Sequence, residues 1–341
     1  MAAKEKGDTV IRLGKVILAL ALIWSLWWAV AGFGLRQSVA GWFDTRAAQG
    51  WQAEYAALTL SGFPLRHRLD LRDPVLADPD TGVAWRGDAL TLQSSAIRPG
   101  RQTLTLPETP QRVSYFDATA LVLAQAAQAE LHLKPAQDLQ LQQMGLQSAA
   151  WRVEQDGAAV MSASALRATM VQGQSDTLYQ IDVAAPGFQP GAGWRDAVRA
   201  LPDLPATFDT LSMDMAVTFS QPWDLGALDA RPQPRRIALK RAEAQWGVLR
   251  ILMAGTVVID PNGVPTGSVS LKADNWRDIL ALAAAGGLAP PAVLRSTERV
   301  LSVLAGLSGN RASLDVTIEI EGGQMMVGFV PLGPAPRLIL R

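Results

Sequence analysis

The stretch LRHRLDLR, residues 65–72, alternates apolar and charged side chains with a period of two. One set holds Leu65, His67, Leu69 and Leu71, and the other holds Arg66, Arg68, Asp70 and Arg72. Side chains of a β-strand point alternately to opposite faces of the sheet. The stretch therefore predicts an antiparallel strand with one buried face and one face in water.

Short segments of the same kind follow along the chain, separated by turns rich in Pro, Gly and Asp. The first group is 89–92, 102–106, 118–123, 129–133, 139–141, 145–153, 158–170 and 178–183, and the second is 211–219, 236–242, 247–259, 267–272, 312–321 and 324–330. Helical patterns are confined to 276–285, capped by Asp274 or Asn275, and to about 292–307. The sequence thus predicts a mainly β (α+β) fold: a long curled antiparallel sheet, a few short helices and a helical pair near the C-terminus.

One apolar run, Val16 to Leu35, contains no charged residue. Twenty helical residues extend about 30 Å, which matches the hydrocarbon thickness of a bilayer. Lys4, Lys6, Arg12 and Lys15 precede the run, which predicts a cytoplasmic N-terminus. We expect a single-pass protein of the bacterial inner membrane with its bulk in the periplasm. Trp24, Trp27 and Trp28 suit the interfacial belt of such a span.

The competing interpretation of this run is a cleaved signal peptide, with Ala29-Val30-Ala31 as the cleavage site. The apolar run continues past that site to Leu35, which favours a retained anchor. Both interpretations deliver the rest of the chain across the membrane.

The predicted organisation divides the chain into six parts. They are a cytoplasmic tail (1–15), a transmembrane helix (16–35), an amphipathic neck (36–57), a first β-rich half (58–185), a boundary rich in Pro and Gly (186–205) and a second β-rich half with the C-terminal helices (206–341). In the neck, Trp42 and Phe43 are candidate interfacial aromatic residues. Alternatively, they pack the neck onto the following domain.

Composition excludes several function classes. The chain balances 31 basic against 31 acidic residues, so we expect no nucleic-acid partner. It has no cysteine and only two histidines, His67 and His132, which predicts no metal site and no thiol chemistry. Phosphate-binding glycine motifs and serine nucleophile motifs are absent from the sequence. We therefore expect neither a cofactor nor an enzymatic activity.

Several short motifs together resemble those of a known family. They are Gly50-Trp51, Leu60-Ser61-Gly62-Phe63-Pro64, Asp73-Pro74, Gly82-Val83-Ala84-Trp85, Arg98-Pro99, the segments 267–276 and 318–323, and Pro331-Leu332-Gly333. With these motifs the exported chain resembles the bacterial domain of unknown function 2125 family, which is found chiefly in alphaproteobacteria. The resemblance implies no established activity. The layout is also similar to AsmA-type envelope proteins, with an anchor followed by a β-rich periplasmic body.

The main functional hypothesis is lipid binding or handling in envelope assembly. Leu69, Leu71, Leu90 and Leu92 are candidates for lining an apolar groove, and Arg66, Arg68 and Arg72 for facing anionic headgroups. The partner would then be membrane lipid. An alternative is an envelope scaffold that binds another protein through a strand edge or an exposed face. A hydrolase acting on envelope polymers is a third possibility. The sequence leaves open whether the apolar face of the sheet is a groove or a closed core.

Overall fold

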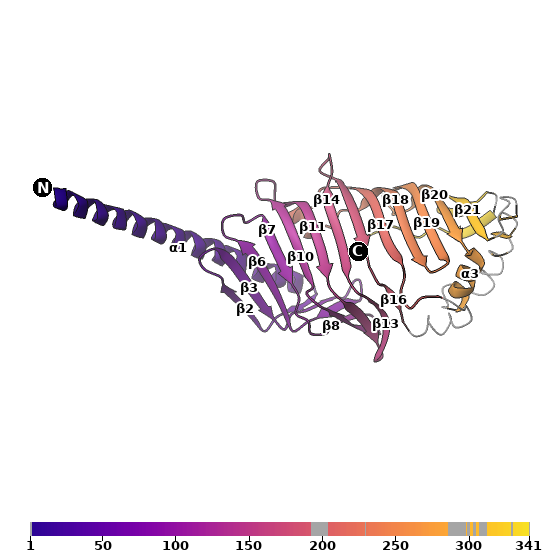
Figure 1. The fold of residues 1–341 in the computed structure, drawn as a ribbon, viewed down its shortest axis with the longest axis horizontal. Helices are drawn as coiled ribbons and strands as arrows, with labels where there is room; N and C mark the ends of the chain where they lie inside the picture. Colours follow the sequence, from indigo (N-terminus) through magenta and orange to yellow (C-terminus); the bar gives the residue numbers. More distant parts are fainter. Residues whose placement is uncertain are drawn as a thin grey trace.

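The computed structural model describes residues 2–191, 204–228, 230–285, 298, 301–302, 305–306, 312–328 and 330–340. It confirms the mainly β fold. A long N-terminal helix leads into two large antiparallel sheets, whose strands follow one another along the long axis of the molecule (Figure 1).

The N-terminal helix α1 runs without a break over Ala2–Ala48. Its part from Arg12 to Ala48 is long and apolar enough to cross a membrane. The predicted neck, 36–57, contains both the end of this helix and the first strand. The helix passes straight through Gly41, ends before Gly50, which has a φ of +91°, and is followed by a strand from Gln52.

A fifteen-stranded sheet forms the larger layer. In sheet order it contains β2 (Ala57–Ser61), β3 (Arg66–Arg72), β6 (Ala89–Ser95), β7 (Arg101–Thr105), β10 (Gln128–Lys134), β11 (Gln140–Ser148), β14 (Leu166–Gln172), β15 (Leu178–Ala184), β17 (Thr210–Phe219), β18 (Pro234–Trp246), β19 (Leu249–Ile259), β20 (Pro265–Asp274), β21 (Ser313–Glu321), β22 (Gln324–Val327) and β23 (Val330–Pro334). Because β15 pairs with β17, the two predicted β-rich halves share this sheet.

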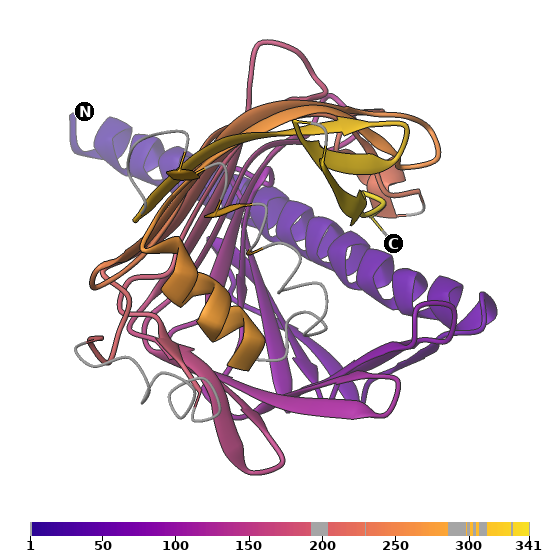
Figure 2. The same cartoon turned by 90° about the vertical axis from the view of Figure 1, so that its right-hand side faces the viewer.

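An eight-stranded sheet forms the second layer. Its order is β1 (Gln52–Glu54), β4 (Val75–Asp78), β5 (Val83–Arg86), β8 (Gln111–Tyr115), β9 (Ala118–Ala124), β12 (Trp151–Gln155), β13 (Ala158–Ala163) and β16 (Gln189–Pro190). Along the chain, the strands alternate between the two sheets, usually with two consecutive strands in each. Seen end-on, the sheets curve around a shared interior that also receives α1 (Figure 2).

This alternation corrects two predicted strands. Residues 145–153 and 158–170 each span the end of one strand and the start of another in the opposite sheet. At the first crossing, Ala149 and Ala150 exchange backbone hydrogen bonds with Gln125 instead of extending either ladder. Neither Pro nor Gly lies at this crossing, so the sequence gives no sign that one strand ends and another begins.

The predicted C-terminal helices are described in part. Helix α3 covers Trp276–Ala285, as expected, and a short 3-10 helix η1 covers Leu225–Leu228. Of the second predicted helix, 292–307, the structure describes residues 298, 301–302 and 305–306, which are helical. Most of the predicted boundary, 186–205, lies outside the described residues.

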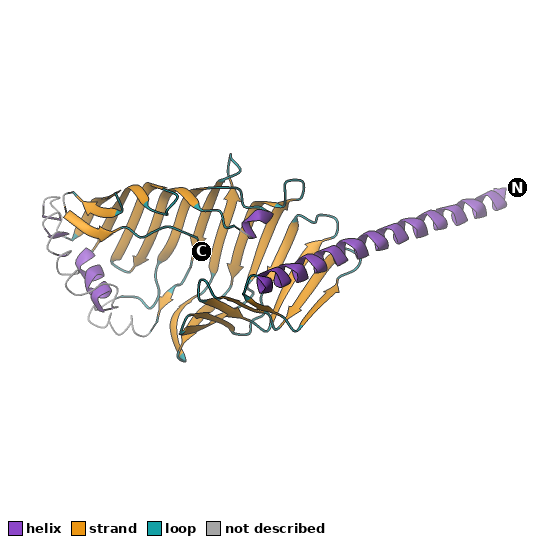
Figure 3. Cartoon of the chain, turned by 180° about the vertical axis from the view of Figure 1, so that it is seen from behind, coloured by secondary structure: helices purple, strands orange, loops and turns teal. Residues whose placement is uncertain are grey.

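The buried core is divided into clusters along the sheets. One cluster joins Phe43 of α1 to Leu58, Leu69 and Leu71 at the first strands. A middle cluster surrounds Tyr179, and two others surround Trp246 and Trp276 near α3. Figure 3 shows the second half of α1 beside the first strands of both layers, where it contacts β1, β2 and β3.

Candidate functional site

An unbroken row of apolar side chains crosses the fifteen-stranded sheet. Each member lies directly opposite the next in the strand register, so the side chains share one face of the sheet, here called the inner face. The row consists of Leu60, Leu69, Leu92, Leu104, Ala129, Leu146, Ala168, Val183, Met213, Ala242, Met253, Leu271 and Val316. Leu69 is in the cluster that packs against α1, which places the inner face toward the helix.

A second apolar row lies beside the first. It contains Leu131, Met144, Met170, Ile181, Met215 and Leu239, again in direct register. Five of the nine methionines of the chain belong to these two rows. Flexible thioether side chains adapt to ligands of varied shape, so the inner face is suited to ligands that have no fixed conformation.

The opposite face, here called the outer face, is polar. The row adjacent to the first apolar row reads Arg68, Gln93, Thr103, Glu130, Gly145, Thr169, Asp182, Asp214 and Arg241. The predicted alternation within residues 65–72 is thereby confirmed, with His67, Leu69 and Leu71 buried and the three arginines exposed.

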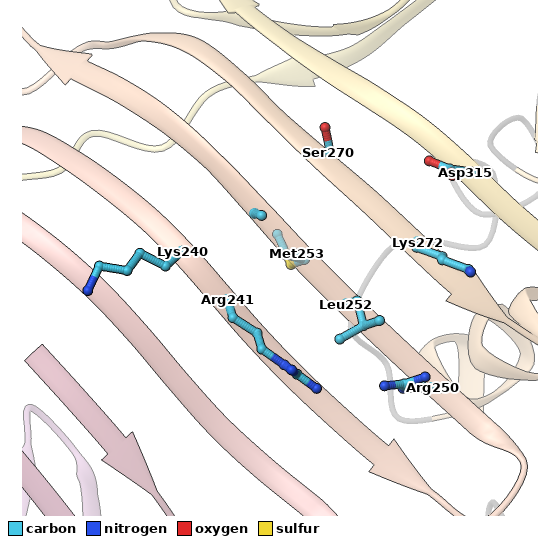
Figure 4. A pocket seen from close by; sticks show the side chains of 9 residues that line it. Lys240, Arg241, Arg250, Leu252, Met253, Ser270, Lys272 and Asp315 are labelled. Carbon is cyan, nitrogen blue, oxygen red and sulfur yellow. The ribbon is translucent and has the colours of Figure 1, made fainter.

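Several charged groups of the outer face pair with one another. A depression of about 370 Å³ lies across β18 to β21. Figure 4 shows Lys240, Arg241, Arg250 and Lys272 among the side chains that line it. Glu243 accepts hydrogen bonds from both Arg241 and Arg250, and Lys240 lies 3.2 Å from Asp214. The hydrogen bonds from Arg250, opposed by burial and aided by Arg241, hold the pKa of Glu243 below its ordinary value. These cations serve the sheet itself, so we do not assign them a ligand.

A large cavity lies where α1 ends. It has a volume of about 940 Å³ and a mixed lining that includes Trp42 and Arg46 of α1, Asp78 and Thr81 of the β4–β5 turn, and Trp223, Arg231 and Gln233. Within the described part of the chain, the buried indole N–H groups of Trp42 and Trp223 have no hydrogen-bond acceptor. Buried donors are normally paired, so these two groups are exceptions to the usual pairing.

Trp223 connects this cavity to the inner face. Its ring meets Phe219 edge-on at 5.4 Å and packs against the middle cluster, which holds Tyr179 and Met170. The Tyr179 hydroxyl donates to the carbonyl oxygen of Leu141 at 2.9 Å. A mixed polar cavity therefore adjoins a long apolar surface, which is the arrangement that an amphiphile requires.

A smaller apolar cavity lies near the far end of the inner face. It measures about 200 Å³ and is lined by Phe208, Trp246, Leu249 and Ile251 together with Ile279 and Leu282 of α3. Phe208 stacks on Trp246 at 4.8 Å. Cavities of this composition accept hydrocarbon and exclude water.

The predicted groove leucines divide into two groups. Leu69 and Leu71 are only 2% and 4% exposed, because Phe43 of α1 packs into their cluster, so they do not face an open groove. Leu90 and Leu92 are partly buried beside the same cluster. The open part of the inner face begins beyond them, and Leu146, for example, is 39% exposed.

The predicted interfacial aromatic residues also differ in their surroundings. Trp24 and Trp28 reach the β2–β3 hairpin, where their indole N–H groups donate to the carbonyl oxygens of Pro64 and Arg66 at 3.0 and 2.9 Å. Trp27 remains 50% exposed. Trp42 and Phe43 pack into the cluster at the first strands, which is the arrangement of the docking alternative.

The predicted basic face is exposed, but its members differ in their surroundings. Arg68 forms a salt bridge with Asp70 at 3.0 Å. Burial acts to raise the pKa of Asp70, but hydrogen bonds from Arg68 and Thr91 outweigh it and leave that pKa below its ordinary value. Arg66 lies beside Trp28, whereas Arg72 occupies the opposite end of β3.

Sequence reasoning missed the cavity at the end of α1. Its lining comes from segments as distant in the sequence as residues 42 and 340. The only sequence signal for it is the apolar character of Trp42 and Trp223, which favours a buried location. In the β4–β5 turn, the Asp78 carboxylate accepts from the Asp80 amide and the Thr81 hydroxyl at 2.9 and 2.8 Å.

Comparison with known families gives one match, which covers nearly the whole chain. Residues 28–336 match the family described as "Uncharacterized protein conserved in bacteria (DUF2125)". The comparison with curated proteins found no match. The match begins within α1 and includes both sheets, so it confirms the resemblance drawn from the short motifs. The chain belongs to the DUF2125 family of bacterial proteins.

Proposed function

We propose that this protein is anchored by α1 in the bacterial inner membrane, with its N-terminus in the cytoplasm and its sheets in the periplasm, and that it holds a lipid there during envelope assembly. The role proposed is binding and handling rather than catalysis. The single observation that carries it is the apolar inner face, which runs across the fifteen-stranded sheet beside a large mixed cavity.

The two surfaces suit the two parts of a lipid. Acyl chains would lie on the inner face and displace water from its partly exposed leucines and methionines, which is favourable at about 25 cal/mol per Å² of buried apolar surface. The headgroup would lie in the cavity at the end of α1. There the exposed guanidinium of Arg231 offers donors to phosphate or ester oxygens.

Native mass spectrometry of the full chain, purified in mild detergent, tests this proposal. The matched variants are Leu146→Glu on the inner face and Val171→Glu on the outer face, whose wild-type side chains are 39% and 38% exposed. We expect the wild type and Val171→Glu to carry phospholipid that is released on unfolding, and Leu146→Glu to carry much less. A wild-type chain without lipid, or equal loss in both variants, would contradict lipid holding.

A second candidate function, binding of another envelope protein, is favoured by a separate exposed patch. Val83, Tyr115 and Phe116 are 43%, 59% and 68% exposed at neighbouring turns of the eight-stranded sheet. Exposed aromatic residues in a contiguous patch are typical of protein-binding surfaces. Substitution of Phe116 by Ser should abolish co-purification of such a partner and leave bound lipid unchanged, whereas loss of lipid alone would contradict a protein-binding role.

A further inference from the structure

The tip of the β2–β3 hairpin is fixed beside the part of α1 that has the composition of a membrane span. Trp24 and Trp28 donate to carbonyl oxygens of the hairpin, and the Trp28 ring meets Phe63 edge-on at 5.5 Å. One turn further along the helix, Gly32 is buried against Leu60 and His67. The hairpin therefore has a defined height along the helix axis, from Trp24 to Gly32.

The other side of α1 at the same height is apolar and exposed. Leu26, Val30 and Phe33 are 67%, 60% and 62% exposed in the absence of a bilayer. Such side chains in a row on a helix indicate contact with lipid. If lipid covers Phe33 on one side of the helix, it also reaches the hairpin that packs on the other side.

Helix length leads to the same conclusion. From Lys15, the last charged residue before the apolar run, to Trp24 there are nine residues, which extend only about 14 Å. A hydrocarbon layer is about 30 Å thick. The bilayer must therefore extend past Trp24 to the level of the hairpin, even when Lys15 and Arg12 reach back toward the cytoplasmic interface.

The hairpin tip has the surface expected of an inserted loop. Phe63 and Leu65 are 56% and 59% exposed, and Ile97 on the adjacent β6–β7 turn is 66% exposed. The two turns are neighbours, because the amide of Ala96 donates to the carbonyl oxygen of Leu65 at 3.0 Å. Exposed arginines, Arg66 and Arg98, flank the apolar tip and can meet lipid phosphates.

We infer that the β2–β3 and β6–β7 turns insert Phe63, Leu65 and Ile97 into the outer interface of the same bilayer that α1 spans. The inference rests on the membrane anchoring proposed above. It makes the turns a second membrane contact, which holds the first strands of the fifteen-stranded sheet against the bilayer surface. The inner face would then begin at the membrane, where its first apolar side chains lie beside α1.

The absence of cysteine from the chain permits a direct test. Single variants Phe63→Cys and Ile97→Cys of the full chain are labelled with an environment-sensitive fluorophore and reconstituted into vesicles of phosphatidylethanolamine and phosphatidylglycerol. Leu20→Cys, in the middle of the apolar run, is the control for lipid. Val248→Cys, 65% exposed at the β18–β19 turn, is the control for water.

We expect the labels at positions 63 and 97 to emit to the blue of the label at 248 and to be quenched by nitroxide lipids with shallow labels. Iodide in the aqueous phase should quench them less than the label at 248. If positions 63 and 97 behave like 248 while position 20 contacts lipid, the insertion of the turns is overturned and the anchor stands. If position 20 also behaves like 248, membrane anchoring itself fails.

Discussion

The imidazole of His67 stacks on the indole of Trp28 with ring centroids 5.0 Å apart, and its Nε2 lies 3.0 Å from the Trp28 carbonyl oxygen. Trp28 belongs to α1 and His67 to β3, so this pair joins the helix to the fifteen-stranded sheet. The side chain of His67 is buried, as its place in the alternating set with Leu69 and Leu71 predicts. The pair fixes the position of α1 more specifically than apolar packing does.

Substitution of His67 by Phe should weaken this contact between α1 and the fifteen-stranded sheet. The ring can still stack on Trp28, but the hydrogen bond to the carbonyl oxygen is lost, at a cost of about 1 kcal/mol. Unfolding of the full chain by denaturant, in a single detergent, measures the difference. His132→Phe on the outer face is the control and should change the stability by less than about 0.5 kcal/mol. Equal effects of the two substitutions would show that the Trp28 contact contributes nothing specific.

Two glycines of α1 differ sharply in their surroundings. A Cβ atom on Gly32 would lie 2.6 Å from Leu60 Cδ2 and 2.9 Å from His67 Cδ2, whereas Gly34 has open space. Gly32→Leu should therefore force the helix away from β2 and β3 and cost about 1–3 kcal/mol. Gly34→Leu should be neutral or stabilising, by up to about 1 kcal/mol, since glycine is a poor helix former.

Protease digestion of the two glycine variants provides a second measurement. Separation of α1 from the hairpin should expose the residues around Arg66 to trypsin in Gly32→Leu but not in Gly34→Leu. Identical digestion and identical unfolding curves would show that the helix does not pack at Gly32 as described.

Much of the fold was predictable because it depends on local patterns. The alternation in residues 65–72 gives β3 its two faces, and the predicted cap at Asp274 or Asn275 marks the start of α3. The division of strands between two sheets was not predictable in this way. Residues 145–153 contain no Pro or Gly at the crossing, and only the pairing of Trp151 with Ala124 and of Ser148 with Leu166 assigns the two ends to different sheets.

The candidate site was predictable in its chemistry and less so in its position. An apolar sheet face was expected, but Leu69 and Leu71 were placed on an open part of it. The sequence contains no local sign that Phe43, more than twenty residues earlier, covers both of them. The same holds for the hairpin contacts of Trp24 and Trp28, since each joins residues about forty positions apart.

The Tyr179 hydroxyl offers a test of the junction between the inner face and the mixed cavity. Tyr179 is fully buried and donates to the Leu141 carbonyl oxygen. Tyr179→Phe should cost about 1 kcal/mol at neutral pH, because the carbonyl loses its donor. Burial also raises the pKa of Tyr179, so the unfolded chain releases this proton first as the pH rises past about 10.

The stability of the wild type should therefore fall above about pH 10 by an amount that the Phe variant lacks. Denaturant unfolding at neutral pH measures the cost of the lost hydrogen bond, and unfolding at alkaline pH measures the additional loss of stability in the wild type. A variant as stable as the wild type at neutral pH, with the same alkaline slope, would contradict a hydrogen-bonded buried hydroxyl at this position.

Glu243 should make the free energy of unfolding depend on pH in the acidic range. Its carboxylate is 8% exposed and accepts hydrogen bonds from Arg250, at 2.7 and 2.9 Å, and from Arg241. Because these contacts lower the pKa of Glu243 in the folded state, the stabilisation is complete above its unfolded pKa, about 4.3. It is lost as the pH falls through the folded pKa, since the protonated carboxyl no longer attracts both guanidinium groups.

Glu243→Gln should remove this dependence and cost about 1–2 kcal/mol at neutral pH, a value reduced from that of a fully buried pair because both arginines are exposed to water. Glu154→Gln is the matched control, because its partner Arg152 is 54% exposed and the pair lies at the surface of β12. We expect the free energy of unfolding of the wild type and of Glu154→Gln to fall in parallel below about pH 4. The free energy of unfolding of Glu243→Gln should be lower at neutral pH and should fall less steeply as the pH decreases. Parallel curves for all three proteins would mean that Glu243 is not held by its arginines in solution, and the pairing that assigns the outer-face cations to the sheet would then have to be abandoned.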